Sequence, residues 1–211
     1  MSNVYIGAQT PKLYLGSEPL AGVKTVTQEA YDALSTAEKE NGLVYNVPKL
    51  SSAMDMASVQ AYCESNMSVT SDTDSSVIVW DGYNSIGANF YYTSSIDVTN
   101  LDYIEYDLTL GSCYGGGATV SQDRWSFVVG ITQRVPFTGA VSNYENISFL
   151  TYKKYTNSNT ALTTERLDVS ALTGQVYLTV YCPGWNAEIS DVALVNNLDK
   201  LYYLGGEYVK E

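Results

Sequence analysis

The spacing of apolar residues changes twice along the chain. Residues 3–24 hold short apolar runs between turns rich in Gly, Pro and Ser, which predicts small strands or a hairpin. Residues 27–42 have helical spacing instead, and the apolar run Leu43–Val47 before Pro48 predicts a strand. From residue 76 onward the pattern is typical of β-strands throughout.

The helical stretch carries signals for two short helices. Thr27 can cap a first helix, in which Tyr31 and Leu34 lie on one face. The sequence Ser35–Glu38 is a capping box, so a second helical turn is predicted to start there. Asn41-Gly42 is a stop signal. We therefore expect one broken helix.

The β-rich part shows many strand candidates and no alternating helices. The candidates are Val77–Trp80, Ala88–Tyr92, Tyr103–Leu110, Trp125–Thr132, Ile147–Tyr155, Gln175–Cys182 and Glu188–Leu194. Short spacing between strands favours an antiparallel β-sandwich. The fold class is therefore mainly β: an antiparallel β-sandwich of jelly-roll type, preceded by a small α+β N-terminal module.

These patterns predict four segments. Residues 1–48 form an N-terminal attachment module of short strands and a broken helix, and residues 49–75 form a linker rich in Ser, Met and Asp, with a short helix at Ala53–Tyr62 as the alternative. Residues 76–198 form the sandwich. Residues 199–211 form a C-terminal strand that returns to the N-terminal module.

One short phrase occurs at both ends of the chain. KLYLGSEPL (12–20) and KLYYLGGEYV (200–209) share Lys-Leu-Tyr, an apolar residue, Gly and Glu, and NVYIG (3–7) is a shorter copy. Each copy predicts a strand closed by a glycine turn. We expect the terminal strands to pair with each other, and the paired end is a candidate docking face.

A second repeat lies inside the sandwich region. Residues 96–101 and 167–172 share the pattern apolar-Asp-Val-Ser/Thr-x-Leu, and a strand follows each. The pattern predicts a turn in which the side chains of Asp and Ser or Thr bind local backbone N–H groups. The flanking apolar residues are expected to enter the core.

Composition and charge exclude several classes. The chain has 211 residues, 45% of them apolar and 16% charged, which favours a folded chain. Its net charge is −12, and residues 51–198 hold 15 acidic and 5 basic side chains, which argues against nucleic-acid binding. No apolar run is long enough for a membrane helix, and the N-terminus has no signal-peptide pattern, so we expect no membrane insertion.

The inventory of reactive residues predicts a protein without catalysis, metal or cofactor. The absence of His removes Ser-His-Asp and Cys-His catalysis and the usual zinc ligands. Three widely spaced Cys predict free thiols rather than a disulfide framework. The oxygens of Ser71–Ser75 are left open as calcium ligands, with a solvated loop as the alternative.

A glycosidase needs two carboxylates across a cleft and remains a distant alternative. Asp81, Asp107, Asp123 and Glu188 are candidates that nothing in the sequence ranks.

Two aromatic turns have the composition of a sugar site. A site of this kind places an aromatic ring against the sugar, with Asp and Asn bonding its hydroxyls. The candidate glycan-binding residues are Trp80, Asp81, Tyr83, Asn84, Trp185 and Asn186. The alternative is that Trp80, Trp125 and Trp185 belong to the core, since large aromatics dominate sandwich cores.

Two resemblances add to these patterns. Residues 76–196, ending in the stretch LDVSALTGQVYLTVYCPGWNAEISDVALV, resemble the jelly rolls of galactose-binding-like domains and carbohydrate-binding modules. The first 48 residues, with YIG, KLYLGS and TQEAYDALSTAEKENGLVYNV, resemble N-terminal modules of tailed-bacteriophage virion proteins. The first resemblance implies glycan binding, and the second implies attachment to a phage particle.

The expected function is that of a non-enzymatic virion surface protein. It would be a capsid decoration protein or a head or tail fibre component, assembled in the cytoplasm of a bacterial host. Its partners would be capsid or tail proteins and host-surface or mucus glycans, and the resemblance implies a homo-oligomer such as a homotrimer. A glycan-binding adhesion module is the alternative. The candidate attachment residues are Tyr5, Tyr14, Leu15, Gly16, Tyr31, Leu34, Tyr203 and Leu204.

Overall fold

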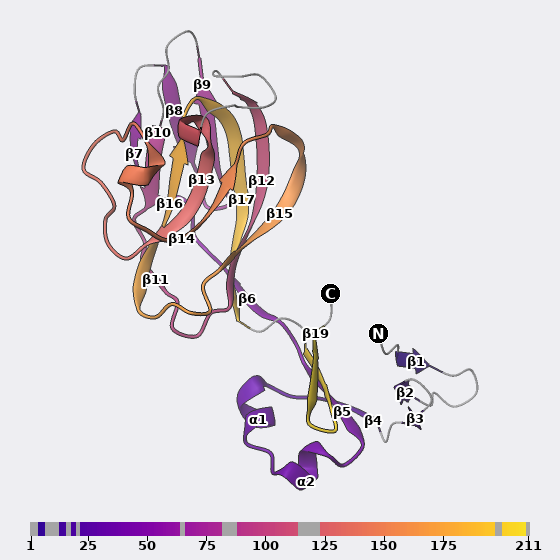
Figure 1. Cartoon of the computed structure of the whole chain (residues 1–211). Helices are drawn as coiled ribbons and strands as arrows, with labels where there is room; N and C mark the ends of the chain where they lie inside the picture. The colour runs from indigo at the N-terminus through magenta and orange to yellow at the C-terminus, as the bar shows by residue number, and fades with distance from the viewer. Residues whose placement is uncertain are drawn as a thin grey trace. The chain divides into compact units, whose positions relative to one another are not determined.

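The computed structural model separates the chain into two compact units. It describes residues 4–6, 13–15, 18–19, 22–63, 66–81, 88–113, 123–196 and 200–209, with the backbone alone for 4–19, 123 and 208–209. The smaller unit comprises residues 1–50 and 196–211, and the larger comprises residues 51–195 (Figure 1). In the described part, no helix is both long and apolar enough to span a bilayer.

The smaller unit contains two sheets. The first has the order β1-β2-β3, with bounds Val4–Ile6, Leu13–Leu15 and Glu18–Pro19. The second has the order β19-β18-β5-β4, in which β4 is Gly22–Thr25, β5 is Leu43–Val47, β18 is Lys200–Tyr203 and β19 is Gly206–Val209.

Both predicted helix starts are confirmed. Helix α1 is Gln28–Asp32, and its cap Thr27 accepts a hydrogen bond from the N–H of Ala30 at 3.2 Å. Helix α2 is Thr36–Lys39, with a complete capping box between Ser35 and Glu38. Gly42 follows with φ of 82°, a left-handed conformation that glycine adopts readily. Local hydrogen bonds therefore fix both helices.

The core of the smaller unit is made of tyrosines from distant segments. Tyr31 of α1 stacks on Tyr202 of β18, with 3.8 Å between ring centroids, and meets Tyr45 of β5 edge-on at 5.5 Å. The Tyr202 hydroxyl lies 3.1 Å from Oε1 of Gln28 and 3.0 Å from Oε2 of Glu207. Burial of aromatic area thus joins the C-terminal strands to the N-terminal helix.

The terminal phrases do not pair with each other. Strand β2 of the first copy pairs with β1 and β3, whereas β18 of the last copy pairs with β5 and β19. The prediction that the N-terminal and C-terminal strands pair with each other was wrong. Strand β18 pairs instead with the apolar strand β5, whose Val44, Tyr45 and Val47 are all buried.

The larger unit is an antiparallel β-sandwich, as predicted. One sheet has the order β14-β13-β16-β10-β7, with β11 beside β16, and the other has the order β15-β12-β17-β9-β8, with β6 beside β17. The first sheet's strands are β7 (Val59–Cys63), β10 (Ala88–Tyr92), β11 (Ile96–Asp97), β13 (Phe127–Thr132), β14 (Phe149–Tyr155) and β16 (Gln175–Cys182). The second sheet's strands are β6 (Leu50–Ala53), β8 (Met67–Ser71), β9 (Ser75–Trp80), β12 (Tyr103–Cys113), β15 (Asn159–Asp168) and β17 (Trp185–Asn196).

Most of the segment predicted to be a linker belongs to the sandwich. Within residues 49–75, β7 pairs with β10 and β8 pairs with β9. Met54, Met56 and Met67 are buried in the main core. The linker prediction was wrong because β7 and β8 are only five residues long, and the buried Met54 and Met56 lie outside any strand.

The sheet that contains β16 is covered on both faces. Its inner face packs on the main core, where Phe90, Phe127 and Leu178 are fully buried. On its outer face lies a second group, here called the outer cluster, whose buried members are Tyr91, Val128, Phe137, Tyr144, Ile147 and Tyr181. Phe137, Tyr144 and Ile147 come from the β13–β14 connection, which contains the 3₁₀ turn Tyr144–Asn146. That connection is therefore packed against the sheet.

The outer cluster requires glycine at position 130. A Cβ atom at Gly130 would lie 2.4 Å from Cδ1 of Phe149 and 2.7 Å from Cβ of Tyr152. Gly130→Ala should therefore destabilise the protein by about 1–3 kcal/mol, because the rings cannot move without disturbing their own packing. Urea unfolding would measure this loss. Gly139→Ala is the matched control, since its Cβ would meet nothing within 4 Å. Equal stability of the two variants would contradict the prediction.

The repeated Asp-Val-Ser/Thr pattern forms the predicted turns. Oδ1 of Asp97 accepts from the backbone N–H of Thr99 at 3.0 Å and from its hydroxyl at 2.6 Å. Asp168 does the same with Ser170, at 3.0 and 2.7 Å. The flanking Val98 and Val169 are fully buried. Each turn therefore places an apolar side chain in the core between two sheet segments.

The hydrogen bonds to Asp168 make part of the stability depend on pH. The Ser170 hydroxyl and N–H lower the pKa of Asp168. The contribution of this carboxylate to the free energy of unfolding is therefore complete above its pKa in the unfolded chain, about 3.9, and is lost as the pH falls through its lower pKa in the folded protein. We expect Asp168→Ala to lower the unfolding free energy at pH 6 and to matter less at pH 3. Denaturant unfolding between pH 2 and 6 would measure this difference. A difference independent of pH would contradict the prediction.

Candidate functional site

Several strand ends meet at the end of the sandwich that lies uppermost in Figure 1. Strand β16 ends at Cys182, and Pro183-Gly184 leads directly into β17 in the other sheet, with φ of 69° at Gly184. A proline followed by a glycine of positive φ suits such a tight turn. The ends of β9 and β12 and the 3₁₀ turn η1 (Asp123–Trp125) lie at the same end.

Trp185, predicted as a glycan-binding residue, belongs to the core. Its side chain is fully buried, and its indole Nε1 donates to the carbonyl oxygen of Trp125 at 2.7 Å. No face of this ring is available to a sugar. The prediction for Trp185 was wrong because the Pro183-Gly184 turn crosses between the sheets and directs the first side chain of β17 inward.

Trp80 and Asn186 come together across the end of the other sheet. Oδ1 of Asn186 accepts from the backbone N–H of Trp80 at 2.9 Å, and Nε1 of Trp80 donates to the carbonyl oxygen of Ser112 at 3.3 Å. The Trp80 ring is half-buried and packs on the main core. Asn186 thus holds a strand end in place, and much of the surface of Trp80 is buried against the core.

The other members of the predicted glycan site are only partly placed. Asp81 is exposed, and its backbone N–H donates to the carbonyl oxygen of Asn66 at 2.7 Å. Tyr83 and Asn84 lie outside the described residues. The glycan-binding roles of Trp80 and Asp81 stay predictions.

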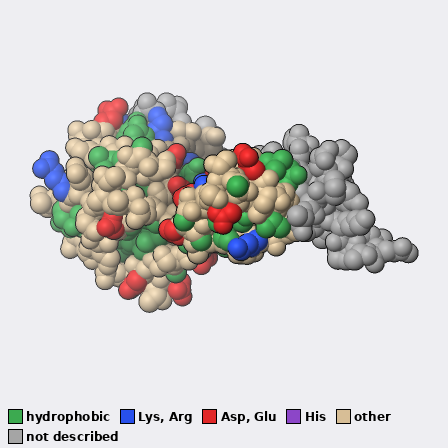
Figure 2. Space-filling view, turned by 90° about the horizontal axis from the view of Figure 1, so that it is seen from below, with side chains coloured by type: hydrophobic (Ala, Val, Ile, Leu, Met, Phe, Trp, Pro, Cys, Tyr) green, Lys and Arg blue, Asp and Glu red, His purple; other side chains and the backbone are tan. Residues whose placement is uncertain are grey.

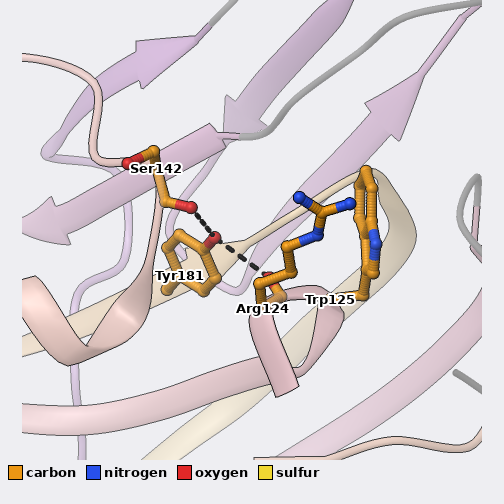
Figure 3. A pocket seen from close by; sticks show the side chains of 4 residues that line it. All are labelled: Arg124, Trp125, Ser142 and Tyr181. Carbon is orange, nitrogen blue, oxygen red and sulfur yellow. Dashed lines mark hydrogen bonds between the residues drawn. The ribbon is translucent and has the colours of Figure 1, made fainter. Parts of the chain in front are cut away.

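A pocket of about 290 Å³ lies beside these residues, at the other sheet (Figure 3). Arg124, Trp125, Ser142 and Tyr181 line it. Its volume is at the lower end of the roughly 300–1,000 Å³ that small-molecule pockets occupy, so it suits a single sugar ring. The sequence does not predict this pocket, because its residues come from three segments that lie far apart along the chain.

The walls of the pocket are held from below. The Tyr181 ring is almost fully buried in the outer cluster, and its hydroxyl lies 3.1 Å from the carbonyl oxygen of Arg124 and 3.0 Å from that of Ser142. The Trp185 indole holds the Trp125 carbonyl from the core side. Backbone segments on both sides of the pocket are therefore fixed by buried aromatic side chains.

The connection that carries Ser142 is anchored by Asn89 of β10. The buried Asn89 amide donates to the carbonyl oxygen of Gly139 at 3.2 Å and accepts from the N–H of Val141 at 2.8 Å. Phe137 packs edge-on against Tyr62 and Tyr91 nearby. The position of Ser142 is thus set by a buried amide and an aromatic cluster.

The predicted attachment residues fall into three groups. Tyr31 is buried and Leu34 is partly buried in the core of the smaller unit, so Tyr31 cannot offer its ring to a partner. Leu204 is 50% exposed at the tip of the β18–β19 hairpin, next to the half-buried Tyr203. The backbones of Tyr5, Tyr14 and Leu15 lie in strands, and Gly16 lies outside the described residues. Attachment through the remaining residues stays a prediction.

Asp107, one of the acidic candidates, and Asp72 of the Ser71–Ser75 loop accept hydrogen bonds from neighbouring groups. Asp107 accepts from the Thr164 hydroxyl at 2.6 Å, and Oδ1 of Asp72 accepts from the N–H groups of Asp74 and Ser75. Cys113 and Cys182 are buried thiols outside any disulfide, and burial raises the pKa of the Cys182 thiol. Among the described residues, no group of three or more His, Cys, Asp or Glu is suited to hold a metal ion.

Acidic side chains dominate the surface charge. Figure 2 shows patches of Asp and Glu scattered over the visible face, with fewer patches of Lys and Arg, in keeping with a net charge of −12. Ion pairs between strands of the sandwich include Arg166 with Glu105 at 2.7 Å and Lys153 with Glu165 at 2.8 Å. Arg124 lies in a pocket on this acidic protein, and Arg134 lines a separate hollow.

No protein-family model and no curated protein matches the chain. The solved structures that resemble it include an adhesin domain and a carbohydrate-binding module. The K2 cleaved adhesin domain of Lys-gingipain has 10% identity and a TM-score of 0.35, covering 71% of this chain and 90% of that one. The family 11 carbohydrate-binding module of the cellulase Lic26A-Cel5E of Clostridium thermocellum has 9% identity and a TM-score of 0.31, covering 72% and 89%. These scores are too low to support an inference about function.

Proposed function

We propose that the chain is a non-enzymatic glycan-binding protein whose site is the pocket of Arg124, Trp125, Ser142 and Tyr181. The pocket itself is the observation that supports the proposal. It has the volume for one sugar ring, and an indole and a guanidinium line it together with Ser142 and Tyr181. Aromatic surface suits the C–H faces of a sugar, and convergent polar groups suit its hydroxyls.

The three tryptophans differ in how much of their surface a ligand can reach. Trp185 is fully buried, and Trp80 is half-buried with its Nε1 already bonded. Trp125 is half-buried and lines the pocket. Of the three, Trp125 is therefore the best placed to contact a sugar.

A glycan array with the full chain, followed by titration calorimetry on the sugars that bind, would test this proposal. Trp125→Ala should weaken binding by about tenfold or more, since aromatic anchors carry much of the energy of such sites. Trp80→Ala tests the alternative site, because it removes a half-buried indole at the same end of the sandwich but outside the pocket. Loss of binding in Trp80→Ala alone would move the site to the predicted Trp80 turn. Absence of any sugar binding would overturn the proposal.

A role in a virion concerns the smaller unit and is a separate proposal. It is supported by the resemblance of the first 48 residues to phage attachment modules and by the exposed Leu204 at a hairpin tip. Mass spectrometry of purified particles, and binding of the chain to particles that lack it, would test this role. Failure of both would remove the virion role without touching the glycan site.

A further inference from the structure

Arg124 is held in a geometry that leaves its guanidinium facing the pocket. Its Cζ lies 5.3 Å from the centroid of the Trp125 ring, and its side chain is exposed. Figure 3 shows the guanidinium beside the indole, across the pocket from Ser142 and Tyr181. Stacking on an aromatic face uses the flat surface of the guanidinium and leaves its N–H groups at the edge available to a ligand.

No carboxylate in the described part of the chain forms an ion pair with Arg124. The chain has three arginines and 23 acidic residues, and Arg166 binds Glu105 at 2.7 Å. A cation on such an acidic protein would ordinarily gain from a neighbouring carboxylate. Arg124 instead packs on Trp125, which in turn is held through its carbonyl oxygen by the buried Trp185. Its position is thus set in advance of any ligand.

We propose that the pocket binds a sugar that carries an anionic oxyacid group (a carboxylate, a sulfate or a phosphate) and that Arg124 binds this group. The inference rests on the proposed glycan-binding function. The planar fork of a guanidinium matches two oxygens of such a group, and these charge-assisted hydrogen bonds are stronger than neutral ones. The sugar ring would lie against Trp125 and near the hydroxyl of Tyr181.

The experiment compares sugars that differ only in charge. Methyl glucuronide is paired with methyl glucoside, galactose 6-sulfate and galactose 6-phosphate are paired with galactose, and each affinity is measured by calorimetry with the full chain. At least one acidic member should bind about tenfold to a hundredfold tighter than its neutral partner, as hydrogen bonds to charged groups imply. The preference should shrink as salt is raised from 50 mM toward 500 mM, because the higher concentration shortens the Debye length to roughly 5 Å or less and screens the charge of Arg124.

Variants at two arginines show which of them causes the preference for the acidic sugar. Arg124→Gln should abolish the preference for the acidic sugar, and Arg124→Lys should keep only part of it because the fork is lost. Arg134→Gln is the matched control: it removes the same charge from an exposed arginine that lines a different hollow with Thr132 and Ser148. Its affinities should equal those of the wild type.

The outcomes separate the inference from the function it rests on. Binding of neutral sugars that Trp125→Ala weakens, with no gain for acidic partners, keeps the glycan-binding function and overturns the role of Arg124. An acidic preference that persists in Arg124→Gln also overturns it. Failure of every sugar to bind overturns both.

Discussion

Trp185→Ala should destabilise the sandwich by about 3–5 kcal/mol, which is a large part of the 5–15 kcal/mol that stabilises a typical domain. The side chain is the largest of the fully buried ones, so its removal opens a cavity where the two sheets meet. The change also removes the donor that binds the Trp125 carbonyl oxygen at 2.7 Å. Guanidinium unfolding followed by tryptophan fluorescence and circular dichroism would measure the loss.

A second substitution separates the two causes. Trp185→Phe removes the N–H donor but keeps much of the apolar volume and so leaves a smaller cavity, and it should therefore cost less than Trp185→Ala. A change below about 1 kcal/mol for Trp185→Ala would show that the residue is not packed as described. Any loss of sugar binding in Trp185→Ala has to be compared with its folded fraction, because this residue supports the pocket without contacting a ligand.

Deletion of residues 200–211 should unfold the described part of the smaller unit and spare the sandwich. It removes β18 and β19, which form half of a four-stranded sheet, and it removes Tyr202 from its stack with Tyr31. The remaining β4 and β5 form a two-stranded sheet, which is marginal in water. Tyr31, Tyr45 and Val47 would be left exposed.

Amide hydrogen exchange on the truncated chain would test this prediction. Protection of residues 43–47 should fall to that of an unfolded segment, while protection in β10, β13 and β16 should remain. Tyr202→Phe is the control, since it keeps the ring stack and loses only the hydrogen bonds to Gln28 and Glu207. Retained protection of β5 after truncation would show that the smaller unit does not depend on its C-terminal strands.

Local signals in the sequence were sufficient for much of the fold. The helix caps at Thr27 and Ser35, the strands Ala88–Tyr92 and Gln175–Cys182, and the Asp168 turn are all set by residues within a few positions of one another. The missed strand β15, Asn159–Asp168, is rich in Thr and polar on both faces, because it lies at the edge of its sheet. Its pattern therefore lacks the apolar alternation of a central strand.

The candidate site was harder to predict because packing between sheets decides it. Trp185, Ala187 and Ile189 alternate as buried residues, and this apolar period of two is a signal that could have placed Trp185 in the core. The pocket offers no such signal, since Arg124, Ser142 and Tyr181 meet only when the β13–β14 connection packs on the sheet.

The pairing of β18 with β5 has a consequence for synthesis. Strand β5 leaves the ribosome before the sandwich and β18 after it, so the small sheet cannot close until the sandwich strands and β18 have been made. Domains ordinarily fold in the order of translation, but here the sheet whose first strands are made before the sandwich is completed only after it. Ribosomes that stop before β18 would release chains with a folded sandwich and an open small sheet, so closure of that sheet would report that β18 has been made.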